Sequence, residues 1–284
     1  MSRTAYRGGR YRPIGALAVP VEDRGLQFAD GVYEVAKCVN GRICDLDRHL
    51  DRLDRSLAAL AIPWPTSRRA LTVVIREALR RNGLRDALIY LQIDRGVAPR
   101  NHLYPRSARP TLVVTVRRAP FPKARELSEG VAVITMADMR WKRCDIKSVS
   151  LLANVMARQR AAEAGCREVW QVDAEGLVTE GAGSNAYIVD GAGRVVTRPL
   201  GHEILGGVTR EVVLELARRE GIGVVERPFT VEEAVSAREA FLTSTSSLVL
   251  PVTRIDGRPV GDGRPGPATV TLLRRYREHM WKER

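Results

Sequence analysis

A chain of 284 residues, 44% of them hydrophobic, is long enough for one large or two medium domains with substantial cores. Its net charge of +13 does not by itself indicate a nucleic-acid-binding protein, because arginines are spread along the chain between carboxylates and aromatic residues make up only 5%. No apolar run of about 18 residues and no apolar N-terminal segment is present, so we expect a soluble cytoplasmic protein without membrane span or signal peptide.

The four cysteines are Cys38, Cys44, Cys144 and Cys166. They form no CxxC pair and have no histidine at a metal-binding spacing, so we expect reduced structural thiols and no metal site.

The first part of the chain predicts a small domain of strands and helices. Leucines at alternating steps of four and three residues give residues 45–60 one apolar helix face, and a second helix is expected over about 66–81. The apolar runs ALIYLQIDRG and TLVVTVRRA predict buried strands, and Asn40-Gly41 predicts a hairpin turn.

The stretch APFPKARELSEG contains two prolines and a charged end, and it predicts a linker. After it we expect strands in VAVITMAD, EVWQVD and VVERPF, helices over about 149–164 and in VTREVVLELARREG, a strand pair around 256–257 and a terminal helix. Strands outnumber helices there and most turns are short, which favours a partly antiparallel sheet or barrel over a doubly wound sheet.

The expected fold class is therefore α/β, in the broad sense that includes α+β, with two domains. A small N-terminal α/β domain is expected over 1–119, a linker over 120–130 and a larger β-barrel-like C-terminal domain with helices over 131–284.

Lysine is rare in this chain. Only five of its 46 basic residues are lysines, so 41 are arginines. Arginine cannot lose its proton near neutral pH or form a Schiff base, whereas a lysine amine can do both in a suitable environment. Each lysine is therefore a candidate for covalent chemistry, although a surface charge is the ordinary role for most of them. Two of the five, Lys142 and Lys147, lie in RWKRCDIKSVSLLANV.

Two segments are suited to bind an anion. In GGVTRE a glycine pair runs into an amphipathic helix, which leaves the N–H groups of Val208 and Thr209 at the helix start. LTSTSSL places five hydroxyl residues, including Ser244 and Thr245, at a strand end. Each segment alone is equally typical of an ordinary helix start or a polar strand end. Together with a buried arginine they would form a phosphate site.

Four further residues are candidate site residues, but the sequence alone leaves an ordinary structural role open for each of them. Arg52 lies beside the leucines of its helix, but a solvated surface charge is the ordinary alternative. Glu180 follows a strand and precedes a glycine-rich turn, where a capping group is common. Arg100 and His102 lie two residues apart in a loop and could bind a carboxylate, although loop histidines are usually incidental.

Eight segments in order indicate a family: DRGLQFADGVYEV, HLDRL, YLQIDRGVAPRNHLYP, RWKRCDIKSVSLLANV, AGCREV, VTEGAGSN, ILGGVTRE and FLTSTSS. With these segments, from Asp23 to about Asp262, the chain resembles the fold-type IV pyridoxal-phosphate-dependent aminotransferases of class IV, and within them the bacterial D-amino-acid transaminases.

The resemblance implies that Lys147 bonds covalently to pyridoxal 5'-phosphate and moves a proton between the substrate Cα and the cofactor. It implies that Glu180 hydrogen-bonds the pyridine nitrogen and keeps it protonated, which makes the ring an electron sink. Lys142 matches a position that the family does not use in catalysis, and we interpret it as a surface or dimer-contact charge.

The resemblance also implies which groups bind the cofactor phosphate. Arg52, the N–H groups of Val208 and Thr209, and the hydroxyls of Ser244 and Thr245 would hold it.

Tyr33, Arg100 and His102 resemble the carboxylate trap of the D-amino-acid enzymes, in which the Arg and His loop reaches in from the partner subunit of a homodimer. The R-x-H pattern is not typical of branched-chain L-aminotransferases or aminodeoxychorismate lyase. The resemblance therefore implies amino transfer from a D-amino acid such as D-alanine to a 2-oxo acid such as 2-oxoglutarate or pyruvate, by a ping-pong cycle.

One segment departs from the family pattern, because EGAGSN stands where serines often follow the glutamate. Ala182 and Gly183 lack hydroxyls that could contact the cofactor ring, so the resemblance does not extend to the fine tuning of the cofactor or to the substrate range.

The alternatives within the fold are a branched-chain L-aminotransferase, an (R)-amine transaminase and a lyase. A non-enzymatic basic binding protein is the alternative from another class, supported only by the net charge.

Overall fold

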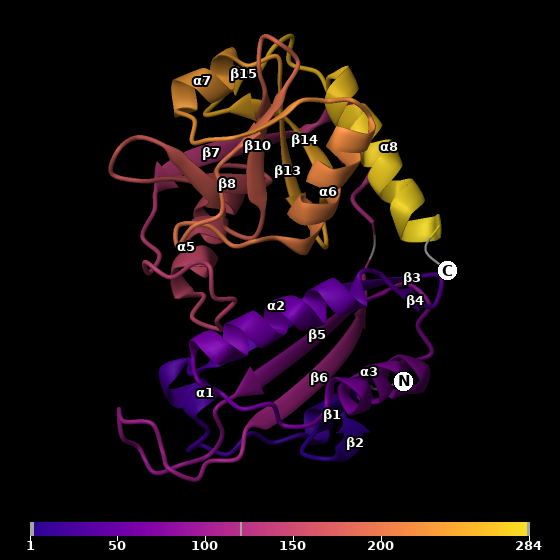
Figure 1. Ribbon diagram of the computed structural model, residues 1–284, viewed down its shortest axis with the longest axis vertical. Coiled ribbons are helices and arrows are strands. Elements are labelled where there is room, and N and C mark those ends of the chain that lie inside the picture. The colour runs from indigo at the N-terminus through magenta and orange to yellow at the C-terminus, as the bar shows by residue number, and fades with distance from the viewer. Residues whose placement is uncertain (1–2, 120, 283–284) are drawn as a thin grey trace. The chain divides into compact units, whose positions relative to one another are not determined.

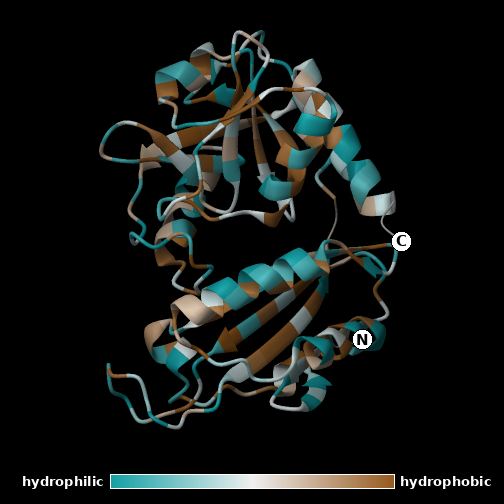
Figure 2. Ribbon diagram, viewed as in Figure 1, coloured by the Kyte–Doolittle hydropathy of each residue, from teal (hydrophilic) through white to brown (hydrophobic). Residues whose placement is uncertain are grey.

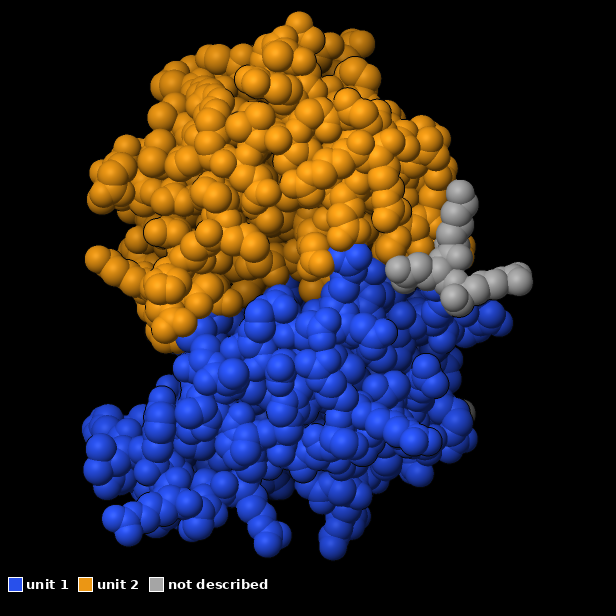
Figure 3. Space-filling view, in the orientation of Figure 1, with its two compact units in different colours: residues 1–120, 146–150 blue, residues 121–145, 151–284 orange. Residues whose placement is uncertain are grey.

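The computed structural model describes residues 3–119 and 121–282. The chain divides into two compact units, coloured separately in Figure 3: unit 1 comprises Met1–Pro120 and Ile146–Ser150, and unit 2 comprises Phe121–Asp145 and Leu151–Arg284. Pro120, at the start of the expected linker, and the outermost residues of both expected domains, 1–2 and 283–284, lie outside the described residues. The short segment Ile146–Ser150 belongs to unit 1 although unit 2 surrounds it in the sequence.

Unit 1 is built on one antiparallel sheet of six strands, in the order β2-β1-β6-β5-β3-β4 (Figure 1). The strands are β1 (Thr4–Arg7), β2 (Arg10–Pro13), β3 (Gly31–Val39), β4 (Arg42–Ile43), β5 (Ala87–Asp94) and β6 (Thr111–Arg118). The two strands predicted from apolar runs are β5 and β6. The predicted turn between β3 and β4 is also confirmed: Asn40 and Gly41 both have positive φ, at 51° and 84°.

Two long helices, α2 (Leu46–Ala59) and α3 (Arg68–Asn82), confirm the two predicted helices of unit 1. Helix α3 begins where the Ser67 side chain accepts a hydrogen bond from the Ala70 N–H, and it ends at Gly83 in the left-handed region. Two shorter helices, η1 (Ile14–Ala16) and α1 (Arg24–Phe28), were not predicted.

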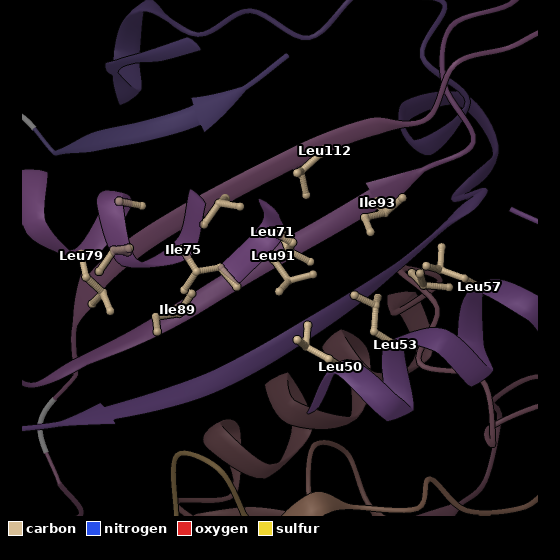
Figure 4. Packing of buried hydrophobic residues seen from close by; sticks show 14 of the residues in the cluster. Leu50, Leu53, Leu57, Leu71, Ile75, Leu79, Ile89, Leu91, Ile93 and Leu112 are labelled. Carbon is tan, nitrogen blue, oxygen red and sulfur yellow. The ribbon is translucent and has the colours of Figure 1, made fainter. Parts of the chain in front are cut away.

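The core of unit 1 lies between α2, α3 and one face of the sheet. Figure 4 labels its main side chains: Leu50, Leu53 and Leu57 from α2, Leu71, Ile75 and Leu79 from α3, and Ile89, Leu91, Ile93 and Leu112 from the strands. In Figure 2 the strands β5 and β6 are largely hydrophobic and α2 is largely hydrophilic, because only the leucine face of the helix meets the core.

Unit 2 contains a mixed sheet of nine strands, with the main order β12-β11-β10-β13-β14-β7-β8-β9 and β15 paired to β14. The pairs β11–β12, β14–β7 and β7–β8 are parallel and the others are antiparallel, which confirms the predicted partly antiparallel sheet. Strand β9, at one end of this order, packs against β10 near the other end, so the sheet curls into a partial barrel. The strands are β7 (Val131–Ala137), β8 (Glu168–Val172), β9 (Val178–Gly181), β10 (Asn185–Val189), β11 (Val195–Thr197), β12 (Val224–Glu226), β13 (Glu239–Ser244), β14 (Leu248–Ile255) and β15 (Arg258–Pro259).

The helices of unit 2 are α4 (Ala124–Glu129), α5 (Leu152–Glu163), α6 (Val208–Arg219), α7 (Val231–Ser236) and α8 (Pro267–Lys282). Helix α4 lies within the segment 120–130 that was expected to be a linker. None of the described helices is long and apolar enough to cross a membrane.

The packing of α3 leads to a stability prediction. Leu71 is fully buried, so Leu71→Ala should lower the free energy of unfolding by about 2–5 kcal/mol, through lost burial and the cavity left behind. Val73, on the same helix, is 61% exposed, and Val73→Ala should change that free energy by only about 0.5 kcal/mol or less. Urea unfolding followed by circular dichroism measures both. Equal effects of the two substitutions would contradict the assigned core.

Candidate active site

Lys147 is half-buried, and its Nζ lies 4.3 Å from the centre of the Tyr33 ring. Main-chain hydrogen bonds fix this position within unit 1: the Tyr33 N–H donates to the Lys147 carbonyl (3.0 Å), and the Val149 N–H donates to the Gly31 carbonyl (3.0 Å). The Lys147 N–H donates in turn to Ser56 Oγ on α2 (3.2 Å). The structure therefore brings together two of the predicted residues, Lys147 and Tyr33.

Lys142, the other lysine of the same segment, is exposed and belongs to unit 2. Its exposure agrees with a plain surface charge.

Next to Tyr33, three polar side chains of β5 contact one another in a row. The Tyr33 ring stacks on Tyr90 with 5.6 Å between centroids, the Tyr90 hydroxyl lies 2.5 Å from Gln92 Oε1, and Gln92 Nε2 donates to both Asp94 oxygens (2.7 and 2.9 Å). Burial raises the pKa of Asp94 to about 7, with the nearby carboxylates Asp23 and Asp30 adding to the effect and the Gln92 hydrogen bond opposing it. Asp94 is thus a buried group that titrates near neutral pH.

Arg52 is held by a buried carboxylate of the same unit. Its Nε and Nη2 donate to the two oxygens of Glu34, each at 2.8 Å, and His49 Nδ1 lies 2.8 Å from Glu34 Oε2. Burial opposes ionisation of Glu34, but the charge and hydrogen bonds of Arg52, helped by His49, keep its pKa well below the usual range. The bidentate pair fixes the plane of the Arg52 guanidinium. Its phosphate contact stays a prediction.

The loop between β5 and β6 carries Arg100 and His102, and both are exposed. They pack on the same aromatic ring: the Arg100 guanidinium lies 4.6 Å from the centre of the Phe28 ring, and the His102 and Phe28 ring centres are 5.4 Å apart. Phe28 therefore holds the two members of the R-x-H pattern side by side.

In unit 2, Glu180 is buried at the end of β9 and accepts hydrogen bonds at both oxygens. Oε1 bonds to Nη1 of Arg140, whereas Oε2 accepts from Asn185 Nδ2 (2.9 Å) and from the Leu205 N–H (3.1 Å). Donors to both oxygens favour the ionised carboxylate. Such a group can keep an aromatic ring nitrogen protonated.

Arg140 links Glu180 to a second carboxylate. Its Nε and Nη2 donate to the two oxygens of Asp138 at 2.9 and 2.7 Å, and Nη2 also lies 3.0 Å from the Glu203 carbonyl. Burial opposes ionisation of Asp138, but Arg140 outweighs it and lowers the pKa of that carboxyl. Sequence reasoning did not select Arg140, and nothing in the sequence separates it from 40 other arginines.

Asn185 connects Glu180 to the start of α6. Besides Glu180, its Nδ2 donates to the Leu205 carbonyl (2.9 Å), and its Oδ1 would lie 2.2 Å from a Cβ built on Gly207. Only glycine permits this approach. Gly207 is the N-cap of α6 and provides no side-chain cap for the first-turn N–H groups, which include those of Val208 and Thr209.

The hydroxyl segment lies next to Asn185 as well. Thr243 of β13 is the register partner of Asn185, so the strand end that carries Ser244 is adjacent to it. Ser244 Oγ accepts from the Ser247 N–H at 3.0 Å, which shapes the turn around Thr245. Thr209 is buried, and its hydroxyl lies 3.3 Å from the Tyr276 hydroxyl of α8. The predicted anion-binding segments of unit 2 are thus neighbours, although their ligand stays a prediction.

Comparison with known proteins identifies the family. Residues 31–255 match the family described as amino-transferase class IV. The chain belongs to this family. Among solved structures, the branched-chain aminotransferase of the archaeon Thermoproteus uzoniensis with norvaline superposes on this class IV chain with a TM-score of 0.88 at 29% identity, covering 100% of this chain and 96% of that one.

Among curated class IV relatives, the D-alanine aminotransferase of Bacillus licheniformis is 44% identical over 265 residues, which are 93% of this chain and 92% of that protein. The D-alanine aminotransferase of Staphylococcus haemolyticus is 38% identical over 273 residues, 96% of each chain.

The titration of Asp94 leads to a pH prediction. Its folded-state pKa of about 7 lies above its ordinary value of 3.8, so the folded protein binds a proton more tightly and loses stability as the pH rises between these values. Asp94→Asn removes the buried charge and should therefore raise the melting temperature more at about pH 9 than at about pH 5.

Differential scanning fluorimetry at the two pH values measures the effect. The exposed Asp262 provides the control, because Asp262→Asn should shift the melting temperature alike at both. A larger gain for Asp94→Asn at the lower pH would contradict the assigned direction.

Proposed function

We propose that this protein is a pyridoxal-phosphate-dependent D-amino-acid aminotransferase. It transfers the amino group of a D-amino acid such as D-alanine to a 2-oxo acid such as 2-oxoglutarate or pyruvate, in a ping-pong cycle. The observation that carries this function is the 44% identity to a D-alanine aminotransferase along 93% of the chain. The R-x-H loop of Arg100 and His102 supports the D-amino-acid specificity.

Pyridoxal 5'-phosphate is the cofactor, and the chain has residues suited to each end of it. The pyridine ring needs a buried anionic partner for its nitrogen, which Glu180 fits, and the phosphate needs donors, which the uncapped start of α6 fits. Asn185 holds these two features next to each other. When bound, the cofactor withdraws electrons from the substrate α-carbon and so eases loss of the α-proton.

Lys147 is the residue that would bond to the cofactor and move the proton. Its Nζ has the reach and flexibility of an amine on a four-carbon chain, while the backbone on both sides is tied to β3. The Tyr33 ring beside it limits the directions that the amine can take. Because Nζ would deliver and remove the proton from one side only, the reaction would be specific for one enantiomer of the substrate.

Glu180 would hold the ring nitrogen in its protonated state. The three donors from Arg140, Asn185 and Leu205 stabilise the carboxylate form and keep it oriented. Because Arg140 shares its charge with Asp138, the cluster keeps a net negative charge that can balance a protonated ring.

The phosphate would be held by five groups. They are the Arg52 guanidinium, the N–H groups of Val208 and Thr209, and the hydroxyls of Ser244 and Thr245. Support comes from the orientation that Glu34 gives to Arg52 and from the absence of a side-chain cap on α6.

The substrate α-carboxylate would be bound by Tyr33, Arg100 and His102. We infer a homodimer in which the Arg100 and His102 loop of one protomer reaches the active site of its partner, which the exposure of both side chains supports. We also infer a cytoplasmic enzyme. The four cysteines are free thiols, as is usual in a reducing compartment.

A panel of substrates tests the function. Purified holoenzyme should form pyruvate from D-alanine with 2-oxoglutarate, and its kcat/KM for D-alanine should exceed that for L-leucine or an (R)-amine by at least about 100-fold. A preference for L-leucine would instead identify a branched-chain L-aminotransferase, and elimination without amino transfer would identify a lyase.

Two lysine variants test the covalent site. After borohydride reduction, intact-mass spectrometry should find the cofactor covalently bound in wild type and in Lys142→Ala, but not in Lys147→Ala. Lys142→Ala should keep its turnover within about threefold, since an exposed charge rarely affects a site. Covalent cofactor in Lys147→Ala would refute the assignment of the nucleophile.

A further inference from the structure

The loop that carries Arg100 and His102 is anchored to one carboxylate, that of Asp30, whose side chain is only 10% exposed. Asp30 Oδ2 accepts a hydrogen bond from Arg24 Nε (2.7 Å) and another from Arg95 Nε (2.8 Å). Only 3% of Arg24 and 5% of Arg95 is exposed, so neither is an ordinary surface charge. Buried ion pairs with good geometry fix the side chains that form them.

Arg24 connects Asp30 to the middle of the loop. Its Nη1 donates to the Asn101 carbonyl at 2.6 Å, and Asn101 stands between Arg100 and His102. The same guanidinium lies 4.8 Å from the centre of the Phe28 ring, on which Arg100 and His102 also pack. A fixed carbonyl at Asn101 restricts the peptide planes on either side, and hence the directions of both flanking side chains.

Arg95 connects Asp30 to the end of α2 and to the far side of the loop. Its Nη2 and Nη1 donate to the Leu60 and Ala61 carbonyls at 2.7 and 3.1 Å. Its guanidinium lies 3.6 Å from the centre of the Tyr104 ring. The loop is therefore held at Asn101 and at Tyr104, on both sides of His102.

The charges of this cluster are mostly paired with one another. Arg24 and Arg95 share the single carboxylate Asp30, and Arg100 adds a third positive charge. The neighbouring Asp23 accepts from the Gly25 N–H and from the Thr111 hydroxyl. Asp94 also lies beside Asp23 and Asp30, so carboxylates offset most of the charge of Arg24 and Arg95, and the cluster acts by holding the loop rather than by its net charge.

We propose that Asp30, acting through Arg24 and Arg95, is a positioning residue that holds the Arg100 and His102 loop in the form that binds the substrate α-carboxylate. This inference rests on the proposed function. Pre-organisation of the loop reduces the ordering cost at binding, so it acts on substrate affinity rather than on the chemical step. The amino acid and the 2-oxo acid each carry an α-carboxylate, so the affinity for either substrate depends on the loop.

The test compares Arg24→Lys with wild-type holoenzyme. Lysine keeps the charge but cannot bond to Asp30 and the Asn101 carbonyl in one plane. The KM values for D-alanine and for 2-oxoglutarate should both rise roughly 10-fold or more, as expected for a misplaced binding group, while kcat changes less than about threefold. Cofactor affinity of the apoenzyme, measured by fluorescence quenching, should stay close to wild type.

Arg68→Lys, the same substitution in an exposed ion pair, is the control. Arg68 also binds a carboxylate, Asp51 at 2.6 Å, and lies 5.6 Å from the centre of the Trp64 ring, but it has no contact with the loop among the interactions of the described residues. Its substitution should leave both KM values unchanged. Asp30→Asn provides a second variant, with the same KM effect expected; if it does not fold, Arg24→Lys decides alone.

A double-mutant cycle separates positioning from general damage. In an Arg100→Ala/His102→Ala background, Arg24→Lys should raise KM by less than about twofold, because both groups that it positions are already absent. Additive effects, an unchanged KM in Arg24→Lys, or equal losses of kcat and cofactor affinity would each overturn the inference. Wild-type enzyme without activity on D-amino acids would refute the proposed function instead, before any variant is compared.

Discussion

The position of the candidate nucleophile depends on two main-chain hydrogen bonds, from Tyr33 to Lys147 and from Val149 to Gly31. They attach Ile146–Ser150 to β3, although the chain on both sides of this segment belongs to unit 2. Unit 1 thus contains the Lys147 amine and Tyr33 beside it, whereas unit 2 contains Glu180 and the start of α6. Together with the hydrogen bond from the Lys147 N–H to Ser56 Oγ, the two main-chain hydrogen bonds fix the backbone of Lys147, and the proposed chemistry depends on this pairing.

Arginine pairing with buried or largely buried carboxylates recurs through the molecule. Glu34 is bound by Arg52, Asp30 by Arg24 and Arg95, and Glu180 by Arg140. These arginines are mostly buried, and each satisfies a carboxylate that would otherwise be costly to desolvate. Part of the high arginine content therefore neutralises carboxylates inside the protein. These arginines are consistent with an enzyme and do not indicate a surface that binds nucleic acid.

Elements with strong periodicity were predictable from the sequence, since a leucine face specifies α2 and apolar runs specify β5 and β6. Short polar elements were not: α4 has no buried residue and therefore no apolar pattern, and β2 is largely exposed. The candidate site divides in the same way. Lys147 and Glu180 stand in recognisable segments, whereas Arg140 and Asp30 acquire their place only from contacts between residues distant in the sequence, such as Arg140 with Glu180 and Arg95 with Asp30.

The close approach of Asn185 to Gly207 also limits which residues position 207 can tolerate. The amide of Asn185 fills the space that a side chain at Gly207 would occupy, and it also bonds to Glu180. Any larger residue at position 207 would displace Asn185 and, with it, the carboxylate. Asn185 thus fixes the spacing between Glu180 and the start of α6, the two features proposed to hold opposite ends of a rigid cofactor, so a single methyl group at position 207 would disturb both proposed contacts.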